Sequence, residues 1–295
     1  MMLEINNVCK KFGEHQVLEG CNLIIPEKTI FGLVGINGAG KSTLLRMIAG
    51  ILKCDNGYIN FNGQNTYEVS ETRQDILYLS DDTFFERGAT IDSLKTMYRN
   101  FYAFDEERFL KYLNIFGLNP KISINNFSKG MKRQVFILMA LAIRPKVLLL
   151  DEAFDGLDPI ARYKVKKALF EIIDETDASI VIASHNLKEL EDVCDSFGIL
   201  ENGKISQAGD LEISKEMVNK YQLVFDHDID LDTFKPLNLL HASKLGSVVT
   251  LVIKGDSKEI KASLEKFNPL VIDVLNVNFE ELFIYEIENR GELYE

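Results

Sequence analysis

The sequence predicts an α/β core with a helical insert and a small α+β C-terminal appendage. Residues 147–150 are a short, wholly apolar run, and residues 179–183 are a second run that is apolar apart from Ser179; such runs are typical of parallel strands buried on both faces of a sheet. Between about residues 91 and 142, apolar side chains recur at three- and four-residue steps, and this period indicates helices. Beyond about residue 209, strand-like and helix-like stretches alternate again, so a second, smaller unit is expected.

The chain opens with a β-rich segment in which Gly13 and Pro26 mark turns. Its expected elements are strands over residues 3–8, 22–25 and 29–34. Residues 41–49 are good helix formers, and this helix is expected to stop at Gly50. A strand, a glycine-rich loop and a helix therefore follow one another, which is the order that a phosphate-binding site requires.

We expect one domain over residues 1–210, with a helical subdomain at about 90–145, and an appendage over 211–295. In the appendage the expected elements are strands at 221–225 and 248–253 and helices at 258–267 and 278–288. No site can be argued for within it from the sequence.

Charge and composition exclude several classes of protein. The net charge is −12 and no dense run of Lys and Arg opposes it, so nucleic acid is not an expected partner. The cysteines are too widely scattered for a zinc or redox motif, which favours reduced thiols in a cytosolic protein; they are Cys9, Cys21, Cys54 and Cys194. The longest apolar run, 135–143, is far shorter than the roughly 20 residues that a membrane-spanning helix needs. A secretory signal is not expected, because no basic segment leads into an apolar core near residues 1–5.

Residues 35–42 read Gly-Ile-Asn-Gly-Ala-Gly-Lys-Ser, which matches the P-loop pattern. Glycines let backbone N–H groups approach a phosphate, Lys41 supplies a positive charge, and the Ser42 hydroxyl can bind Mg²⁺. The predicted ATP-binding residues of this loop are Gly35, Asn37, Gly38, Ala39, Gly40, Lys41, Ser42 and Thr43. A chance glycine-rich turn and a Rossmann dinucleotide site are the alternatives, and the glycine spacing favours the P-loop.

Two adjacent carboxylates, Asp151 and Glu152, follow the apolar run 147–150. Ligands of open α/β sheets collect at strand C-termini, so Asp151 is predicted to hold Mg²⁺ and Glu152 to act on the attacking water. A solvated acidic turn is the alternative reading. His185 also follows an apolar strand and is predicted to contact the γ-phosphate, although a histidine there could instead start a helix or pack.

Over roughly residues 2–210 these motifs resemble the nucleotide-binding subunits of ABC transporters. The resemblance implies a RecA-like P-loop NTPase core, with a mixed sheet and a β-rich N-terminal part, that binds and hydrolyses ATP with Mg²⁺. Phe12 resembles the aromatic residue that stacks on adenine. Residues 126–134 resemble the family signature, and 154–158 the loop that follows the catalytic glutamate.

In that family two subunits pair head to tail, so the resemblance implies that one subunit contacts the ATP of the other. The residues implied for this contact in trans are Ser128, Lys129, Gly130 and Asp158. The signature departs from the usual Leu-Ser-Gly-Gly-Gln in a way that resembles bacterial exporter subunits. The appendage over 211–295 resembles the C-terminal extension of those subunits, which implies a dimerising or regulatory role for it. The second departure is Ser80-Asp81-Asp82 where the family commonly has glutamine, so Asp81 is a further candidate to face the metal.

We therefore expect a cytoplasmic ATPase, peripheral on the inner face of the membrane, that powers substrate translocation through separate membrane permease subunits, with export favoured over import. Its other expected partner is a second copy of itself or a paralogous ATPase subunit. A regulatory nucleotide-binding module is one alternative. A DNA-repair or translation ATPase is another, but only 87 positions separate Lys41 from Ser128, no heptad array fills them, and the chain carries one ATP-binding domain.

Overall fold

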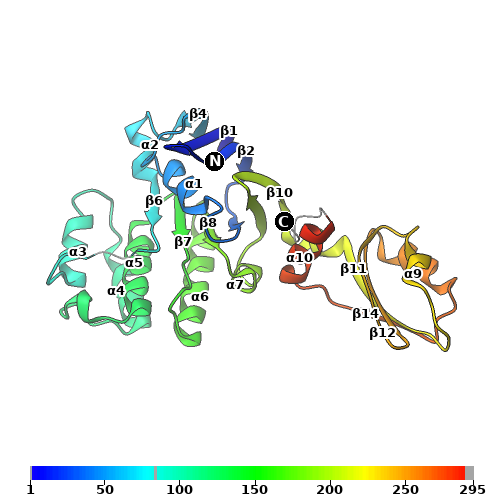
Figure 1. Ribbon diagram of the computed structural model, residues 1–295. Helices are drawn as coiled ribbons and strands as arrows, with labels where there is room; N and C mark the ends of the chain where they lie inside the picture. The colour runs from blue at the N-terminus through cyan, green and yellow to red at the C-terminus, as the bar shows by residue number, and fades with distance from the viewer. Residues whose placement is uncertain (1, 83–84, 290–295) are drawn as a thin grey trace. The chain divides into compact units, whose positions relative to one another are not determined.

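The computed structural model describes residues 2–82 and 85–289 and divides the chain into two compact units (Figure 1). Unit 1 is Met1–Ala208 and unit 2 is Gly209–Glu295. Within the described residues, no helix combines the length and the apolar character needed to cross a bilayer.

A six-stranded sheet with the order β10-β9-β3-β8-β7-β6 forms the centre of unit 1. Its strands are β3 (Ile30–Val34), β6 (Ile76–Leu79), β7 (Val147–Asp151), β8 (Ser179–Ser184), β9 (Ser196–Glu201) and β10 (Lys204–Asp210). The pairs from β9 to β6 are parallel. Only two residues connect β9 to β10, so this last pair is antiparallel and the sheet is mixed. The predicted α/β fold class is confirmed.

A separate sheet with the order β2-β1-β4-β5 contains the β-rich start of the chain. Its strands are β1 (Leu3–Phe12), β2 (His15–Ile25), β4 (Asn56–Phe61) and β5 (Gln64–Asn65). β1 is longer than expected, because register shifts between Ile5 and Lys11 interrupt the alternation that the sequence should show. Asn7, at φ 47°, lies within this irregular stretch.

Helix α1 (Lys41–Ile48) links the two sheets through a shared core. Leu44 and Leu45 of this helix are fully buried and belong to the same cluster as Ile5 of β1 and Leu149 of β7. Burial of a Leu side chain contributes about 1.5–3 kcal/mol. This packing fixes the start of α1 beside the C-terminal ends of the parallel strands.

The helical insert lies beside β6 at the edge of the six-stranded sheet (Figure 1). It consists of α3 (Ile91–Tyr98), α4 (Glu106–Phe116), the short helix η1 (Ile124–Asn126) and α5 (Lys129–Ile143). Each long helix has a side-chain N-cap, from Thr90, Asp105 and Ser128 respectively. The remaining helices of unit 1 are α2 (Ser70–Asp75), α6 (Pro159–Glu175) and α7 (Leu187–Glu191).

Unit 2 is an antiparallel sheet with its own core. The strand order is β12-β13-β11-β14, and the strands are β11 (Val218–Val224), β12 (Leu239–Leu245), β13 (Val248–Lys254) and β14 (Val271–Leu275). Its helices are α8 (Leu211–Glu216), η2 (Leu231–Phe234), α9 (Ser257–Glu265) and α10 (Phe279–Asn289). Tyr221, Leu223 and Leu251 are fully buried in this core. Strands β12 and β14 were not expected from the sequence. Leu240 is the one buried residue of β12 and β14 has none, so neither strand shows a clear apolar alternation.

Candidate nucleotide-binding and hydrolysis site

A cavity of about 370 Å³ lies where β3, β6 and β7 end. Parallel pairing brings these strand ends to one edge of the sheet, because Leu150 of β7 pairs with Ile182 of β8 and Leu33 of β3 pairs with Ala183. The lining residues are Phe12, Val17, Asn37, Gly38, Gly40, Lys41, Ser42, Thr43, Asp81, Asp151 and Glu152. The structure thus brings together the predicted glycine loop, both predicted strand-end carboxylates, Asp81 and Phe12.

The glycine loop connects β3 to α1 and needs its glycines for two reasons. Gly38 and Gly40 have φ values of 86° and 103°, a region that residues with a Cβ rarely adopt. A Cβ at Gly35 would lie 2.5 Å from the Leu200 carbonyl oxygen, and one at Gly40 would lie 2.9 Å from a methyl group of Leu18. Neighbouring residues therefore pack tightly against the loop. Its backbone N–H groups lie at the start of α1, where an anion is stabilised.

The Lys41 side chain is buried and crosses the loop. Its Nζ donates hydrogen bonds to the carbonyl oxygens of Gly35, at 2.6 Å, and Ile36, at 3.2 Å. Burial lowers the pKa of Lys41, and the nearby Glu152 and Asp151 carboxylates partly oppose that shift. These hydrogen bonds hold the ammonium group against the loop, within electrostatic reach of the two carboxylates.

Asp151 ends strand β7 and is buried. Its Oδ2 accepts a hydrogen bond from the Tyr78 hydroxyl at 3.1 Å, and the Ser42 hydroxyl also donates to its carboxylate. Burial raises the pKa of Asp151, while these two hydrogen bonds favour the ionised form and oppose the rise. Burial of the Tyr78 side chain raises its pKa to about 12, so the phenol remains a hydrogen-bond donor at neutral pH.

The paired Ser42 and Asp151 side chains fit a Mg²⁺ site that is completed by a nucleotide. Within residues 2–82 and 85–289, no three His, Cys, Asp or Glu side chains form a group able to hold a metal by themselves. Mg²⁺ usually binds one or two carboxylates, several waters and the phosphates of its substrate rather than an all-protein cage. A hydroxyl and a carboxylate beside a phosphate cradle are ligands of that kind.

Glu152 is held by two neighbouring side chains from the end of β8. Its Oε1 lies 2.9 Å from His185 Nδ1, and its Oε2 accepts a hydrogen bond from the Ser184 hydroxyl at 3.0 Å. The backbone is left-handed at Glu152, with φ 49°, and its N–H donates to the Ala183 carbonyl at 2.9 Å. A non-glycine residue in this conformation is strained, and such strain concentrates at functional sites.

Sequence reasoning missed three side chains that contact the predicted site residues. Tyr78 bonds to Asp151, Ser184 bonds to Glu152, and Arg133 of α5 donates to Asp81 at 2.7 Å. A polar residue within the apolar run 76–79 is a signal for Tyr78, and the position of Ser184 directly before His185 is a signal for that serine. Arg133 lies within the signature-like stretch 126–134, but nothing in that pattern indicates its burial or its contact with Asp81, since an arginine on a helix is normally exposed.

The four residues expected to act in trans lie at the starts of helices α5 and α6 and do not line the cavity of their own chain. Ser128 caps α5 by accepting from the Met131 N–H at 3.2 Å, and Asp158 caps α6 by accepting from two backbone N–H groups. Lys129 forms an ion pair with Asp155 at 2.6 Å. A Cβ on Gly130 would lie 2.4 Å from the Gly156 carbonyl oxygen, so this glycine permits close packing of the two segments.

Phe12 ends strand β1, at the rim of the cavity, with 48% of its surface exposed. The Lys10 ammonium lies 5.5 Å from the centre of the Phe12 ring. An exposed aromatic ring beside a phosphate cradle offers a flat surface on which a base can stack.

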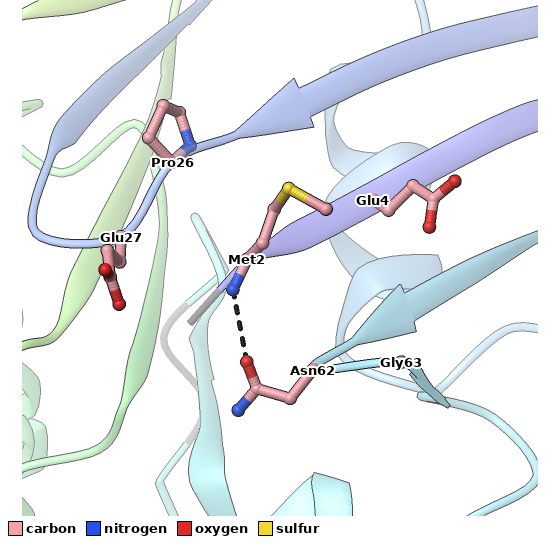
Figure 2. A pocket seen from close by; sticks show the side chains of 6 residues that line it. All are labelled: Met2, Glu4, Pro26, Glu27, Asn62 and Gly63. Atoms are coloured by element: carbon pink, nitrogen blue, oxygen red, sulfur yellow. Dashed lines mark hydrogen bonds between the residues drawn. The ribbon is translucent and has the colours of Figure 1, made fainter.

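A second hollow, of about 520 Å³, lies at the N-terminal sheet (Figure 2). It is lined by Met2, Glu4, Pro26, Glu27, Asn62 and Gly63, and the Met2 N–H donates to Asn62 at 3.1 Å. Its lining contains two carboxylates and no Lys or Arg. These residues do not provide the cationic cradle that a triphosphate requires.

A strand, a glycine cradle with its lysine, and strand-end carboxylates in one cavity define a P-loop nucleotide-binding ATPase domain. Comparisons with known proteins agree with this assignment. The family model described as ABC transporter matches residues 18–155. The ABC transporter ATP-binding protein YtrB of Bacillus subtilis (strain 168) is 33% identical over 284 residues, which cover 96% of this chain and 97% of that protein. The chain therefore belongs to the ABC transporter ATP-binding proteins.

Other relatives and solved structures support the same family. The methionine import ATP-binding protein MetN of Clostridium tetani (strain Massachusetts / E88) is 28% identical, and the match covers 95% of this chain and 94% of that protein. A structure described as an ATP-binding subunit of an ABC transporter is similar with a TM-score of 0.67 and 29% identity, covering 73% of this chain and 92% of that one. The structure of cbiO1 from Clostridium perfringens, described as part of the ABC transporter complex cbiONQ, has a TM-score of 0.60 and 26% identity, covering 70% and 88%.

The predicted class and activity are thereby confirmed: the chain is an ATP-binding, ATP-hydrolysing subunit of a transporter and powers translocation. The direction of transport stays a prediction, since an import ATP-binding protein matches this chain over nearly its whole length.

Proposed function

We propose that the cavity binds MgATP and that hydrolysis takes place between Lys41 and the pair Glu152–His185. The observation that carries this proposal is the placement of Glu152, which lines the cavity of Lys41 while Ser184 and His185 hold its two oxygens. A carboxylate with both oxygens fixed can orient one water for attack on a γ-phosphate.

The residues predicted for this site then have roles that their chemistry supports. The loop glycines with Asn37 and Ala39 cradle the phosphates, Lys41 binds β and γ oxygens, and Phe12 stacks on the adenine. Ser42 and Asp151 would hold Mg²⁺, whose charge neutralises the phosphate oxygens when it is bound. Thr43 extends the hydroxyl-rich start of α1, and His185 contacts the γ-phosphate while its Nδ1 positions Glu152.

The active form is proposed to be a head-to-tail dimer with a second copy or a paralogous ATPase subunit. Ser128, Lys129, Gly130 and Asp158 would contact the nucleotide of the opposite subunit. The placement of Ser128, Lys129 and Gly130 at the start of α5, outside the lining of their own cavity, supports this arrangement, because a helix N-terminus with hydroxyl and cationic side chains attracts phosphate. Asp158 is included by the family resemblance alone, since its carboxylate accepts from the N–H groups at the start of α6.

Translocation itself is proposed to take place through separate membrane permease subunits, with this chain peripheral on the cytoplasmic face. The support is that relatives named as ATP-binding proteins of transporters match over 95–96% of the chain. Export through those subunits is the predicted direction.

The test of the site is the variant Glu152→Gln, which keeps the shape of the side chain and removes its charge. ATP hydrolysis and equilibrium binding of ATP are measured on the same purified protein, with Glu171→Gln as a control, since Glu171 lies on α6 and is bound by Lys111 and Tyr112. We expect hydrolysis to fall by about 10²–10³-fold while ATP binding persists. Unchanged hydrolysis in Glu152→Gln would refute the assignment.

A further inference from the structure

Arg133 is a buried arginine whose guanidinium joins three segments at the cavity. The residue is 1% exposed and lies one helical turn after Lys129 on α5. Its Nη1 donates to the carbonyl oxygens of Ser80, at 2.9 Å, and Asp151, at 3.2 Å, and its Nη2 donates to Asp81 Oδ1 at 2.7 Å. It therefore ties α5 to the ends of β6 and β7.

Asp81 is the acidic partner, and it lines the cavity with its side chain 49% exposed. Lys129 approaches the same oxygen, Oδ1, at 3.8 Å, and pairs more closely with Asp155 at 2.6 Å. Asp81 is thus held from the α5 side by one buried cation and one exposed cation.

The Arg133–Asp81 pair affects the net charge that a nucleotide meets in the cavity. The lining carries the carboxylates Asp81, Asp151 and Glu152, and Lys41 is the one cation in that lining. A triphosphate is strongly anionic, and each uncompensated carboxylate nearby opposes its binding. Asp151 can be offset by a bound Mg²⁺, whereas Asp81 is offset by Arg133 from outside the cavity.

We propose that Arg133 is a positioning residue of the ATPase site that neutralises Asp81 and fixes its carboxylate at the cavity rim, so that Asp81 is a charge-paired residue and not a metal ligand. This inference rests on the proposed function, since it concerns the binding of MgATP in the same cavity. It also makes Arg133 the link between the cavity and the first turn of α5, where Ser128 and Gly130 lie.

A purely structural arginine would also satisfy the carbonyl oxygens of Ser80 and Asp151. Removing it would then cost stability, because two buried acceptors lose their donor, but the cost would not depend on the charge of Asp81. The two roles are separated by a double-variant cycle of Arg133→Gln and Asp81→Asn, since coupling appears only if the charges act on each other.

In steady-state hydrolysis of MgATP we expect Arg133→Gln to raise the KM by about tenfold, since Asp81 then faces the triphosphate unpaired. Asp81→Asn alone removes a negative charge, so its KM stays within about threefold of the wild type. The double variant is expected to return the KM to within about threefold of the wild type. The Mg²⁺ concentration for half-maximal activity is expected to stay within about threefold in Asp81→Asn, because a residue that does not ligate the metal does not set its affinity.

The matched control is Arg108→Gln, which removes another buried arginine, ion-paired with Glu175 and not part of the cavity lining. It should lower the thermal midpoint and leave the KM unchanged. The inference is overturned if the double variant is no better than Arg133→Gln, or if Asp81→Asn abolishes hydrolysis or sharply raises the Mg²⁺ requirement. If the wild type itself neither binds nor hydrolyses ATP in the same assay, the proposed function fails instead.

Discussion

Glu152 Oε1 lies 2.9 Å from His185 Nδ1, although the two residues are 33 positions apart in the chain. The contact follows from the parallel pairing of β7 and β8, in which Asp151 lies opposite Ala183. Each residue comes directly after its strand, so the sheet places both side chains at the same edge. This pair is the chemical centre of the proposed site.

The first prediction concerns His185. Replacing it with Ala removes one of the two groups that hold Glu152 and a proposed contact to the γ-phosphate. We expect kcat for ATP hydrolysis to fall by about 10–100-fold with the KM changed by less than about threefold. Separate determination of kcat and KM checks this.

His227→Ala is a matched control for that experiment. His185 and His227 are similarly exposed, at 55% and 56%, and His227 Nδ1 likewise lies 2.7 Å from a carboxylate oxygen, that of Asp226. His227 is in unit 2, so its variant should hydrolyse ATP like the wild type. Equal activity of the two variants would mean that His185 takes no part in hydrolysis.

The second prediction concerns Ser184, the other residue that holds Glu152. Ser184→Ala frees Oε2 of Glu152, and we expect kcat to fall by about threefold to tenfold, less than for His185→Ala. Ser179→Ala is the control, because Ser179 is a buried serine at the other end of β8 whose hydroxyl donates to the Pro26 carbonyl at 2.9 Å. Both variants should lose roughly 1 kcal/mol of stability. A drop in kcat of the same size in both would contradict a specific role for Ser184.

The third prediction follows from the pKa of Asp151, which burial raises above the ordinary value of 3.8. The folded state then holds a proton on Asp151 more tightly than the unfolded state does. Stability therefore declines as pH rises from that ordinary value through the raised one. Above that window the buried, ionised carboxylate lowers the stability of the nucleotide-free protein.

Asp151→Asn removes this charge. We expect the variant to unfold at a higher temperature than the wild type at neutral pH, while losing hydrolysis by about 10²-fold or more. The difference in thermal midpoint should shrink as the pH is lowered to about 4. A variant less stable than the wild type at neutral pH would mean that the hydrogen bonds from Tyr78 and Ser42 outweigh the cost of burial.

The fourth prediction concerns the division of the chain. The core of unit 1 and the core of unit 2 are built from different residues. A chain truncated after Asp210 is therefore expected to fold cooperatively and to bind ATP within about threefold of the full chain. Thermal unfolding and nucleotide titration test this, and an aggregated or unfolded fragment would show that residues 211–295 are needed for the fold of the first domain.

Much of this arrangement could be predicted from the sequence. The apolar runs before Asp151 and His185 indicated buried parallel strands, and the glycine spacing before Lys41 indicated the phosphate cradle. Because parallel strands end at one edge, their terminal residues could be placed together without knowing the strand order.

The rest depends on contacts that no local pattern encodes. The φ of 49° at Glu152 and its bond to Ser184 arise from the pairing of β7 with β8. The burial of Arg133 arises where α5 packs beside the segment that contains Asp81 and beside the end of β7. In β1, register shifts break the alternation on which strand boundaries are read, so its extent was underestimated.

The most direct test is a structure of Glu152→Gln determined with ATP and Mg²⁺. We predict that the phosphates lie in the loop 35–43 with the γ-phosphate between Lys41 and residue 152, and that Ser42 and Asp151 hold the metal. ATP bound elsewhere on the protein, or a metal held away from Ser42 and Asp151, would contradict the account.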